Sequence, residues 1–510
     1  MVVMIMNDYI LGIDIGTTGC KSVVYNINGR KIESAYKEYT LSYPKPNWAE
    51  INPNIWWKSV ISTIKKILNK NISSKNIKSI GISCTNALVS VDKNGKVLRN
   101  AIMQIDQRTN EEMDWIKENI NENSLFEITG NRVAPGTFSA PIILWLKNNE
   151  PDVYSKTYKF LVPTGYIVQK LTDEFTIDPS RASTTMLFNI NSREWSDDLI
   201  HELNIDKNKL PEVLPSDKIA GYITKEAAKN TGLKKGTPVV TGCMDTVAAA
   251  LGSKITKHGD VFAILGTVGR LGVCLDKPIF DKRFINCCYG IEDKWLSMAA
   301  INGAGSSYRW FKNNFAHFES IKANNDFDPY EVLNHKANKS PPGSKGLIYL
   351  PYISAERSPI WSSSAKGAFL GINNTHKKKD FIRALLEGIC YAFKHNKEVF
   401  INKLNIDFDN LVITGGGAKS NLWRQILSDI LNLKILLPSI IETETLGVAY
   451  IAGKAVKLNN NFLQQKIEET IIPNYNNNQI YTEIYNIYKD LHVVLKKTNK
   501  KIHHVQTTYY

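Results

Sequence analysis

Apolar runs separated by short glycine turns open the chain. Tyr9–Asp14 is apolar, Gly16–Gly19 reads as a turn, and Cys20–Ile27 is a second apolar run. Another turn at Asn28–Gly29 leads into Lys31–Leu41. Short runs joined by tight turns are typical of hairpins. The pattern therefore predicts three antiparallel strands at the start, rather than a β-α-β unit.

Helical and strand patterns alternate after this opening. The spacing of apolar residues predicts a helix over Ile55–Leu68 and a strand over Ile77–Ser83. Later, Val239–Thr241 reads as a strand, Gly242 as a turn and Asp245–Leu251 as an alanine-rich helix. This alternation favours the α/β class.

The opening pattern returns 250 residues further on. Val261–Leu265 is an apolar run, and Leu265-Gly-Thr-Val-Gly269 matches Ile15-Gly-Thr-Thr-Gly19 at its Gly-Thr and second Gly. A repeat of half the chain indicates two similar domains. We expect them at 1–253 and 254–490, with the boundary near Gly252–Gly259. A basic tail follows at 491–510, which we expect to fray after Leu495.

Composition narrows the class of protein. The chain has 510 residues, 43% hydrophobic and 22% charged, which excludes a disordered or fibrous protein. No apolar run approaches the roughly 18 residues of a membrane span, so we expect no membrane partner. The net charge is +14, but 51 of the 63 basic residues are Lys, which argues against a nucleic-acid partner. Seven Cys without a C-x-x-C motif favour a reducing cytoplasm.

The first glycine turn has the composition of a phosphate-binding loop. In Asp14–Lys21, glycines such as Gly16 allow close approach of the backbone to a ligand, and Thr17 and Thr18 offer hydroxyl donors. Lys21 adds a positive charge, and Asp14 at a strand end could hold a water of Mg²⁺. Taken alone, the motif is more often an ordinary hairpin turn. The second copy at Gly266–Thr267 favours two loops that clamp a triphosphate across a cleft.

A third glycine motif follows the apolar run Leu411–Thr414. Gly415, Gly416, Gly417 and Ala418 come directly after this expected strand, and Ser420 or Asn421 is expected to cap the next helix. Consecutive glycines at a strand end let a flat ring lie against the backbone. This motif and Asn421 are predicted to bind ATP at its adenosine, the alternative for the motif being a flexible loop.

Together these residues resemble the FGGY family of carbohydrate kinases, which has the actin-like (ribonuclease H-like) ATPase fold. The resemblance runs from about Tyr9 to Gly453. The blocks that carry it are Phe138–Glu150, with Ile142 where a Lys is usual, Pro351–Pro359, Gly367–Ile372 and Asp380–Gly388. Three further stretches read most like the xylulokinases of this family: Trp48–Pro53, Gly415–Gln425 and Leu446–Tyr450. The resemblance implies two such domains with a cleft between them.

The resemblance also implies a mechanism. Asp245 falls on the family's catalytic base, which accepts the proton of a sugar hydroxyl as its oxygen attacks the γ-phosphate of ATP. The alternative for Asp245 is a helix N-cap. Mg²⁺ near Asp14 and Asp245 would bridge the phosphate oxygens.

The expected sugar site departs from the family pattern. Thr85 and Asn86 stand where xylulokinases carry a Met-His pair, while Asp106 and Arg108 match a block that lines the sugar pocket. A surface salt bridge is the alternative for that second pair. In the second Gly-Thr turn, Val268 stands where the family usually has Ser, so one hydroxyl is lost. The resemblance implies phosphorylation of D-xylulose to D-xylulose 5-phosphate first. Another substrate of the family, namely ribulose, gluconate, erythritol or glycerol, stays open. So does a different function, a catalytically silent protein that binds sugar or nucleotide. The resemblance also leaves a homodimer open.

Overall fold

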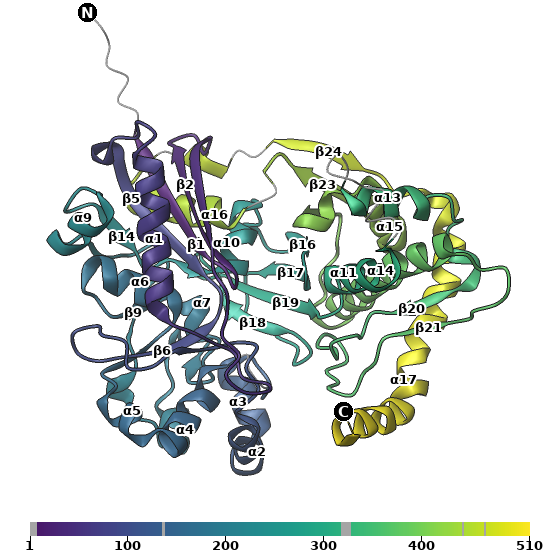
Figure 1. Cartoon of the computed structure of the whole chain (residues 1–510), viewed down its shortest axis with the longest axis horizontal. Coiled ribbons are helices and arrows are strands. Elements are labelled where there is room, and N and C mark those ends of the chain that lie inside the picture. The colour runs from purple at the N-terminus through teal and green to yellow at the C-terminus, as the bar shows by residue number, and fades with distance from the viewer. Residues whose placement is uncertain are drawn as a thin grey trace, which may run out of the picture.

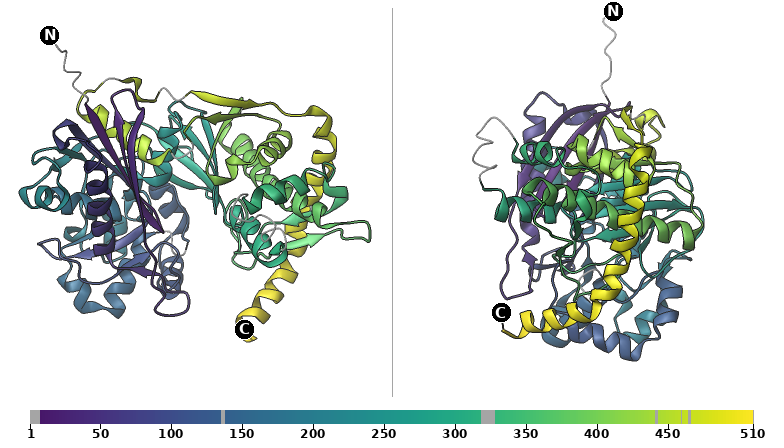
Figure 2. Two further views of the ribbon diagram at one scale, coloured as in Figure 1. Left: turned by 45° about the horizontal axis from the view of Figure 1, so that its top comes forward. Right: turned by 90° about the vertical axis from the view of Figure 1, so that its right-hand side faces the viewer.

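The computed structural model describes residues 8–134, 138–317, 328–440, 443–458, 460–463 and 466–509. These residues form two lobes, each built on a mixed seven-stranded sheet (Figure 1). The early part of the chain makes one lobe and the green and yellow part makes most of the other (Figures 1 and 2). The expected α/β architecture of two domains is confirmed.

The first sheet begins with the predicted antiparallel strands. β1 (Tyr9–Ile15) pairs with β2 (Gly19–Asn26), and β2 pairs with β3 (Lys31–Glu38), both antiparallel. β5 (Ile77–Cys84) then runs parallel to β1. The strand order is β13-β14-β5-β1-β2-β3, with β15 also on β5, where the later strands are β13 (Ile219–Tyr222), β14 (Pro238–Val240) and β15 (Cys243–Met244).

Helix α1 (Pro53–Leu68) covers one side of this sheet, two residues longer at its start than predicted. Pro53 fits the first helical position, where its missing N–H costs nothing, and Asn52 caps the helix by accepting from the N–H of Asn54. Trp56, buried with Val60, Ile64 and Ile67 at a spacing of three to four residues, faces the core. The further helices of this lobe's core are α6 (Pro163–Thr172) and α9 (Lys225–Thr231).

The lower part of the first lobe is a small four-stranded sheet with helices around it (Figure 1). Its strands are β4 (Glu50–Ile51), β6 (Ala87–Val91), β7 (Ala101–Met103) and β8 (Lys159–Leu161), and its helices are α2 (Asn110–Asn119), α3 (Glu122–Thr129), α4 (Ser139–Asn149), α5 (Pro151–Lys156), α7 (Pro179–Ala182) and α8 (Asp197–Glu202). Two short ribbons complete it: β9 (Thr176–Ile177) with β12 (Glu212–Val213), and β10 (Phe188–Asn189) with β11 (Glu194–Trp195).

The second sheet repeats the topology of the first. β16 (Val261–Leu265) pairs antiparallel with β17 (Gly269–Leu275) and parallel with β22 (Asn410–Thr414), as β1 does with β2 and β5. The remaining strands are β18 (Ile285–Cys288), β19 (Trp295–Ile301), β23 (Lys434–Pro438) and β24 (Ile467–Ile471), in the order β18-β19-β17-β16-β22-β23-β24. The repeat predicted from two Gly-Thr turns is thus a repeat of strand pairing.

Long helices surround the second sheet. They are α11 (Gly305–Phe315), α13 (Pro329–Ala337), α14 (Lys378–Leu404), α15 (Asn421–Leu431) and α17 (Asn478–Tyr509), with a hairpin of β20 (Ile348–Leu350) and β21 (Ala368–Leu370) beside them. The yellow helix α17 runs along the outer edge of the lobe (Figure 2). It buries Tyr481, Tyr485 and Tyr488. The expectation that the tail frays after Leu495 is wrong, because this anchored helix continues to Tyr509.

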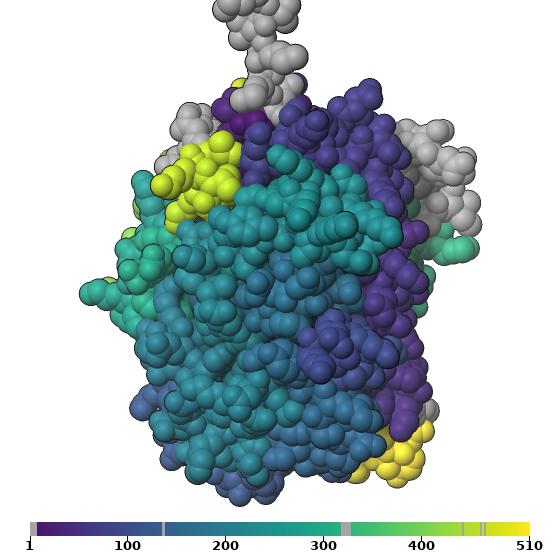
Figure 3. Space-filling model, turned by 90° about the vertical axis from the view of Figure 1, so that its left-hand side faces the viewer, coloured from purple at the N-terminus to yellow at the C-terminus, as the bar shows by residue number. Residues whose placement is uncertain are grey.

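Two helices join the lobes. α10 (Asp245–Gly252) packs against α16 (Glu444–Ala455), and α16 also packs on β1 and β5 of the first lobe. Figure 3 shows this late, yellow-green segment among the purple and teal surface of the early chain. The Tyr25 and Thr445 hydroxyls lie 2.8 Å apart, and the Ser79 hydroxyl donates to the carbonyl of Ala452 at 2.6 Å. The C-terminal half of the chain therefore completes the core of the N-terminal lobe.

Glycines make this close packing possible. A Cβ on Gly12 of β1 would lie 2.2 Å from the carbonyl oxygen of Thr445, and one on Gly81 of β5 would lie 2.1 Å from that of Val448. A Cβ on Gly447 would lie 1.9 Å from the oxygen of Ala248. No real side chain tolerates such distances, so backbone contacts backbone here.

All seven cysteines are buried and free, consistent with the prediction that they form no disulfide framework. Among the described helices, none is both long enough and apolar enough to cross a membrane.

Two glycines of α16 provide a matched test of the helix contact. Gly447→Ala forces a shift at Ala248, and we expect it to lower the free energy of unfolding by at least about 2 kcal/mol. Gly453→Ala meets its nearest atom, in Ile10, at 3.8 Å. Since alanine is the better helix former, that variant should be neutral or up to about 1 kcal/mol more stable. Urea unfolding checks both, and equal stability of the two variants would contradict the contact.

Candidate active site

Three parallel strands end at one edge of the first sheet. β1 and β15 lie on either side of β5, with Ile15 opposite Cys84 and Met244 also opposite Cys84. Side chains that follow these strands therefore gather at this edge. They are Asp14 and the first Gly-Thr turn, Thr85 and Asn86, and Asp245, all candidates from the sequence.

The first Gly-Thr turn is held by its own backbone and by Tyr39. The Gly16 N–H donates to the Gly19 carbonyl at 2.9 Å, and the Tyr39 hydroxyl donates to the carbonyls of Gly16 and Gly19 at 2.7 and 3.0 Å. The Tyr39 N–H donates to the carbonyl of Thr18 at 3.0 Å. Since Tyr39 holds three carbonyls of the turn by hydrogen bonds, the backbone of the turn has a fixed shape.

Asp245 is the first residue of α10, so it is not the N-cap, which is Met244. Its Oδ1 accepts from the N–H of Thr246 at 2.7 Å and lies 3.5 Å from a terminal nitrogen of Arg181. Its side chain is 36% exposed, whereas that of Arg181 is 2% exposed. Oδ2 has no partner within the described residues, so it is the oxygen available to accept a proton.

Acidic groups crowd around Asp14. Burial, with the nearby Glu444 carboxylate, raises the pKa of the Asp14 carboxyl to about 8, while the Ser83 hydroxyl, 2.6 Å from Oδ1, opposes the shift. Burial, followed by the Asp245 charge, also raises the pKa of Glu444. Within the described residues no three His, Cys, Asp or Glu side chains form a direct metal-ligand group. The crowded carboxylates of Asp14, Glu444 and Asp245 are groups that a bound cation would stabilise, which is compatible with the Mg²⁺ expected near Asp14 and Asp245.

The expected sugar loop contacts the first Gly-Thr turn directly. The Thr85 N–H donates to the Ile15 carbonyl at 2.8 Å, and the Thr85 hydroxyl lies 3.2 Å from that of Thr17. Gln104 donates its amide to the same Thr85 hydroxyl at 3.0 Å. Thr85 and Asn86 are buried. Gln104 was not predicted, because no motif of the sequence marks it.

Asp106 and Arg108 form a buried ionic network. Asp106 accepts from the N–H of Ala49 at 2.6 Å and from Arg108 Nε and Nη2 at 2.8 and 2.7 Å. Arg108 also pairs with Glu50 at 2.8 Å and lies 3.6 Å from the centre of the Trp48 ring. The side chains of Asp106 and Arg108 are each 1% exposed. The pair does form a salt bridge, but it is buried, so the surface salt bridge considered from the sequence is wrong in its placement; the network also ties down the segment that carries Ala49 and Trp48. Contact of this pair with sugar stays a prediction.

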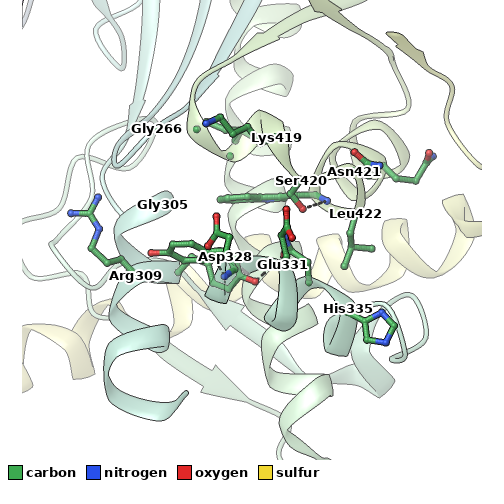
Figure 4. A pocket seen from close by; sticks show the side chains of 18 of the residues that line it. Gly266, Gly305, Arg309, Asp328, Glu331, His335, Lys419, Ser420, Asn421 and Leu422 are labelled. Atoms are coloured by element: carbon green, nitrogen blue, oxygen red, sulfur yellow. Dashed lines mark hydrogen bonds between the residues drawn. The ribbon is translucent and has the colours of Figure 1, made fainter. Parts of the chain in front are cut away.

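A cavity of about 1070 Å³ lies in the second lobe (Figure 4). Among the predicted ATP-binding residues, Gly266, Thr267, Gly416, Gly417 and Asn421 line it. β16 and β22 are parallel neighbours, so the second Gly-Thr turn and the triple-glycine segment meet at one sheet edge. Gly415 and Ala418 flank this lining, whereas Gly16, Thr17, Thr18 and Lys21 belong to the first lobe and lie outside it.

Helix α11 supports the second Gly-Thr turn. The N–H groups of Gly305 and Ser306 donate to the carbonyls of Gly266 and Thr267 at 2.9 and 3.0 Å. One turn later, Arg309 donates to the Thr267 hydroxyl at 2.9 Å. Figure 4 shows Arg309 at one end of the cavity and His335 at the other.

Three aromatic rings are part of the cavity lining. Tyr308 and Trp423 are buried with ring centroids 5.9 Å apart, and Tyr330 lies 5.0 Å from Tyr308. Ser420, one of the two caps considered, caps α15 by accepting from the Trp423 N–H at 3.2 Å. Arg309 and these rings were missed in the sequence because they come from α11, α13 and α15 and meet only in the fold. A cavity lined by aromatic rings, with glycines at one edge, suits a nucleotide.

Two lobes with repeated topology are the architecture of the actin-like ATPase fold, and sequence comparison gives the family. Sequence models of the FGGY family of carbohydrate kinases match the chain twice, the N-terminal domain at residues 9–252 and the C-terminal domain at 261–456. The chain belongs to the FGGY family and is an ATP-dependent carbohydrate kinase.

Relatives of two substrate types resemble the chain. Xylulose kinase of Staphylococcus xylosus is 33% identical over 95% of this chain and 99% of its own. Gluconokinase of Bacillus subtilis is 32% identical over 88% of each. The crystal structures of ligand-bound xylulose kinase and of gluconate kinase from Lactobacillus acidophilus both align with a TM-score of 0.89 and 26% identity, over 97% of this chain and 100% of theirs.

The Asp106 network predicts a stability effect. Asp106→Ala leaves Arg108 buried beside Glu50 alone, and we expect the free energy of unfolding to fall by about 3–5 kcal/mol. Asp114→Ala removes the exposed pair with Lys117 and should change it by less than about 0.5 kcal/mol. Urea unfolding measures both. A stability loss for Asp106→Ala no larger than that for Asp114→Ala would show that the network does not support the fold.

Proposed function

We propose that this kinase phosphorylates the terminal hydroxyl of an open-chain sugar, D-xylulose first, to give D-xylulose 5-phosphate. The observation that carries the proposal is the edge of the first sheet, where Asp245 is partly exposed beside the Thr85–Asn86 loop and the first Gly-Thr turn. The full-length similarity to a xylulose kinase supports the same substrate.

In the proposed reaction, Asp245 Oδ2 takes the proton of the sugar hydroxyl as its oxygen attacks the γ-phosphorus. The bond from that phosphorus to the bridging oxygen of ADP breaks, and the bond to the sugar oxygen forms. Thr246 and Arg181 hold Oδ1, so the basic oxygen keeps a fixed direction. A positioned base of this kind contributes about 100- to 10,000-fold to the rate.

The nucleotide would bind with adenosine in the cavity of the second lobe, beside Gly416 and Gly417, and its phosphates along Gly266 and Thr267 toward the first lobe. Gly16, Thr17, Thr18 and Lys21 would complete the phosphate site from the first lobe. Bound Mg²⁺ supplies charge neutralisation on the phosphates. Asp14 and Asp245 are the side chains that would hold it, and Asp14 already lies in a group of carboxylates that a cation would stabilise.

Gluconate is the second candidate substrate, favoured by the gluconokinase relative and by Thr85–Asn86 in place of Met-His. A coupled ADP-release assay over D-xylulose, D-ribulose, gluconate, erythritol and glycerol decides between them. The highest kcat/KM with D-xylulose supports the first proposal. Activity with gluconate and none with D-xylulose moves the substrate to the aldonates. ADP release that no sugar increases would contradict the kinase mechanism. The cytoplasm and a homodimer stay predictions.

Asp245→Asn removes the proposed base and keeps the shape of the side chain. We expect kcat to fall at least about 100-fold, with the KM for ATP within about twofold of wild type, because the adenosine site is in the other lobe. Steady-state ADP release measures both constants, and Asp217→Asn, in a surface pair with Lys454, serves as control. Wild-type kcat in Asp245→Asn would refute the base role.

Arg309→Met tests the cavity as the nucleotide site. Loss of a charged donor to phosphate costs about 1.5–3 kcal/mol, so we expect the KM for ATP to rise about 10- to 100-fold. The KM for sugar should stay within about twofold. Lys312→Met changes a cation on the same helix that lies over the Tyr330 ring and should have a smaller effect. An unchanged KM for ATP in Arg309→Met would place the phosphates elsewhere.

A further inference from the structure

Arg181 is a buried cation that the mechanism above uses only to hold Oδ1 of Asp245, with no link to the sugar loop. It lies in α7, a four-residue helix whose cap, Asp178, accepts from the N–H of Ser180 at 2.8 Å. The Arg181 side chain is 2% exposed, and its Nε has no hydrogen-bond partner within the described residues. Burial of a guanidinium is costly unless its charge is compensated. The groups that surround Arg181 should therefore indicate which function its charge serves.

Helix α7 is tied to the strand that delivers Asp245. The Met244 N–H donates to the Ser180 hydroxyl at 3.0 Å, and that hydroxyl also donates to Asp178. Met244 in turn lies opposite Cys84 in the β15–β5 pair. The residue before Asp245, the residue before Thr85 and helix α7 thus form one connected unit.

The guanidinium of Arg181 bridges the two functional segments of this unit. Its Nη2 donates to the carbonyl of Cys84, directly before Thr85, and the same nitrogen lies 3.5 Å from Asp245 Oδ1. Three other charged groups interact with Asp245: Asp14 on β1, Glu444 on α16 and Arg270 on β17. Among these groups, Arg181 is the one that contacts both the Cys84 carbonyl and the Asp245 carboxylate.

We propose that Arg181 is a positioning residue that fixes the Asp245 carboxylate relative to the Thr85–Asn86 loop, so that base and sugar hydroxyl meet in one geometry. This inference rests on the proposed role of Asp245. Oδ1 is held between Arg181 and Thr246, and Oδ2 is left toward the substrate. A misplacement of about 1 Å at a reacting group can cost on the order of 100-fold in rate.

The planar guanidinium suits this task better than an ammonium. Its donors have fixed directions and can serve a carbonyl and a carboxylate together, whereas the lysine ammonium is a point charge on a flexible stem. Exchange for lysine should therefore keep charge compensation and lose part of the orientation.

The test compares Arg181→Met and Arg181→Lys with a matched exchange elsewhere. Arg383 is also buried, pairs with Glu387 at 2.8 Å and donates to the Ser340 carbonyl at 3.0 Å, but it lies on α14 in the second lobe. We expect kcat to fall about 100-fold in Arg181→Met and about 10-fold in Arg181→Lys, with the KM for ATP within twofold. Arg383→Lys should lower the melting temperature and keep kcat per folded molecule.

The outcomes separate this inference from the proposed function. Equal kcat loss in Arg181→Lys and Arg383→Lys would show a purely structural role and overturn the positioning role. Wild-type kcat in folded Arg181→Lys, with Asp245→Asn inactive, would also overturn it and leave the base intact. Wild-type activity in Asp245→Asn would instead remove the proposed function itself. If Arg181→Met does not fold, as judged by circular dichroism, Arg181→Lys decides alone.

Discussion

The close contact of α16 with α10 and with the first sheet is the constraint on which the rest of the structure depends. Gly12, Gly81 and Gly447 bring backbone against backbone, and any side chain at these positions would overlap a carbonyl oxygen. The contact places late sequence inside the N-terminal lobe and packs α16 against α10, the helix whose first residue is Asp245. The helix that carries the candidate base is thus held by a segment from the other half of the chain.

The sequence predicted the topology where the signal was local. The apolar runs around Gly16 and Gly266 indicated two matching sets of antiparallel strands, and both are present. The helix contact could not be predicted, because Gly12 and Gly447 are far apart in sequence and the family-like stretch Leu446–Tyr450, which holds Gly447, does not reveal what it packs against. The same holds for the cavity, since Arg309, Tyr330 and Trp423 come from three helices. The basic residues at the end of the chain suggested fraying, but the buried tyrosines of α17 anchor the helix that carries them.

The two candidate sites differ in how they are built. The cavity predicted to take the nucleotide has glycines and aromatic rings in its lining. The edge of the first sheet is polar and tightly connected, and each of its segments is held by a neighbour: the Gly16 turn by Tyr39, Thr85 by Gln104, and Asp245 by Arg181 and Thr246. Such a division suits a reaction in which a flexible triphosphate meets an acceptor that must be fixed.

The most direct test of the proposed mechanism is to track the γ-phosphate of ATP by phosphorus-31 NMR. With the purified enzyme, ATP, Mg²⁺ and D-xylulose, we predict a phosphomonoester signal split by the two protons of a CH₂–O–P group, appearing together with ADP. The same mixture with Asp245→Asn should show almost none of it. Formation of inorganic phosphate alone, or no sugar phosphate from any sugar of the panel, would contradict the account.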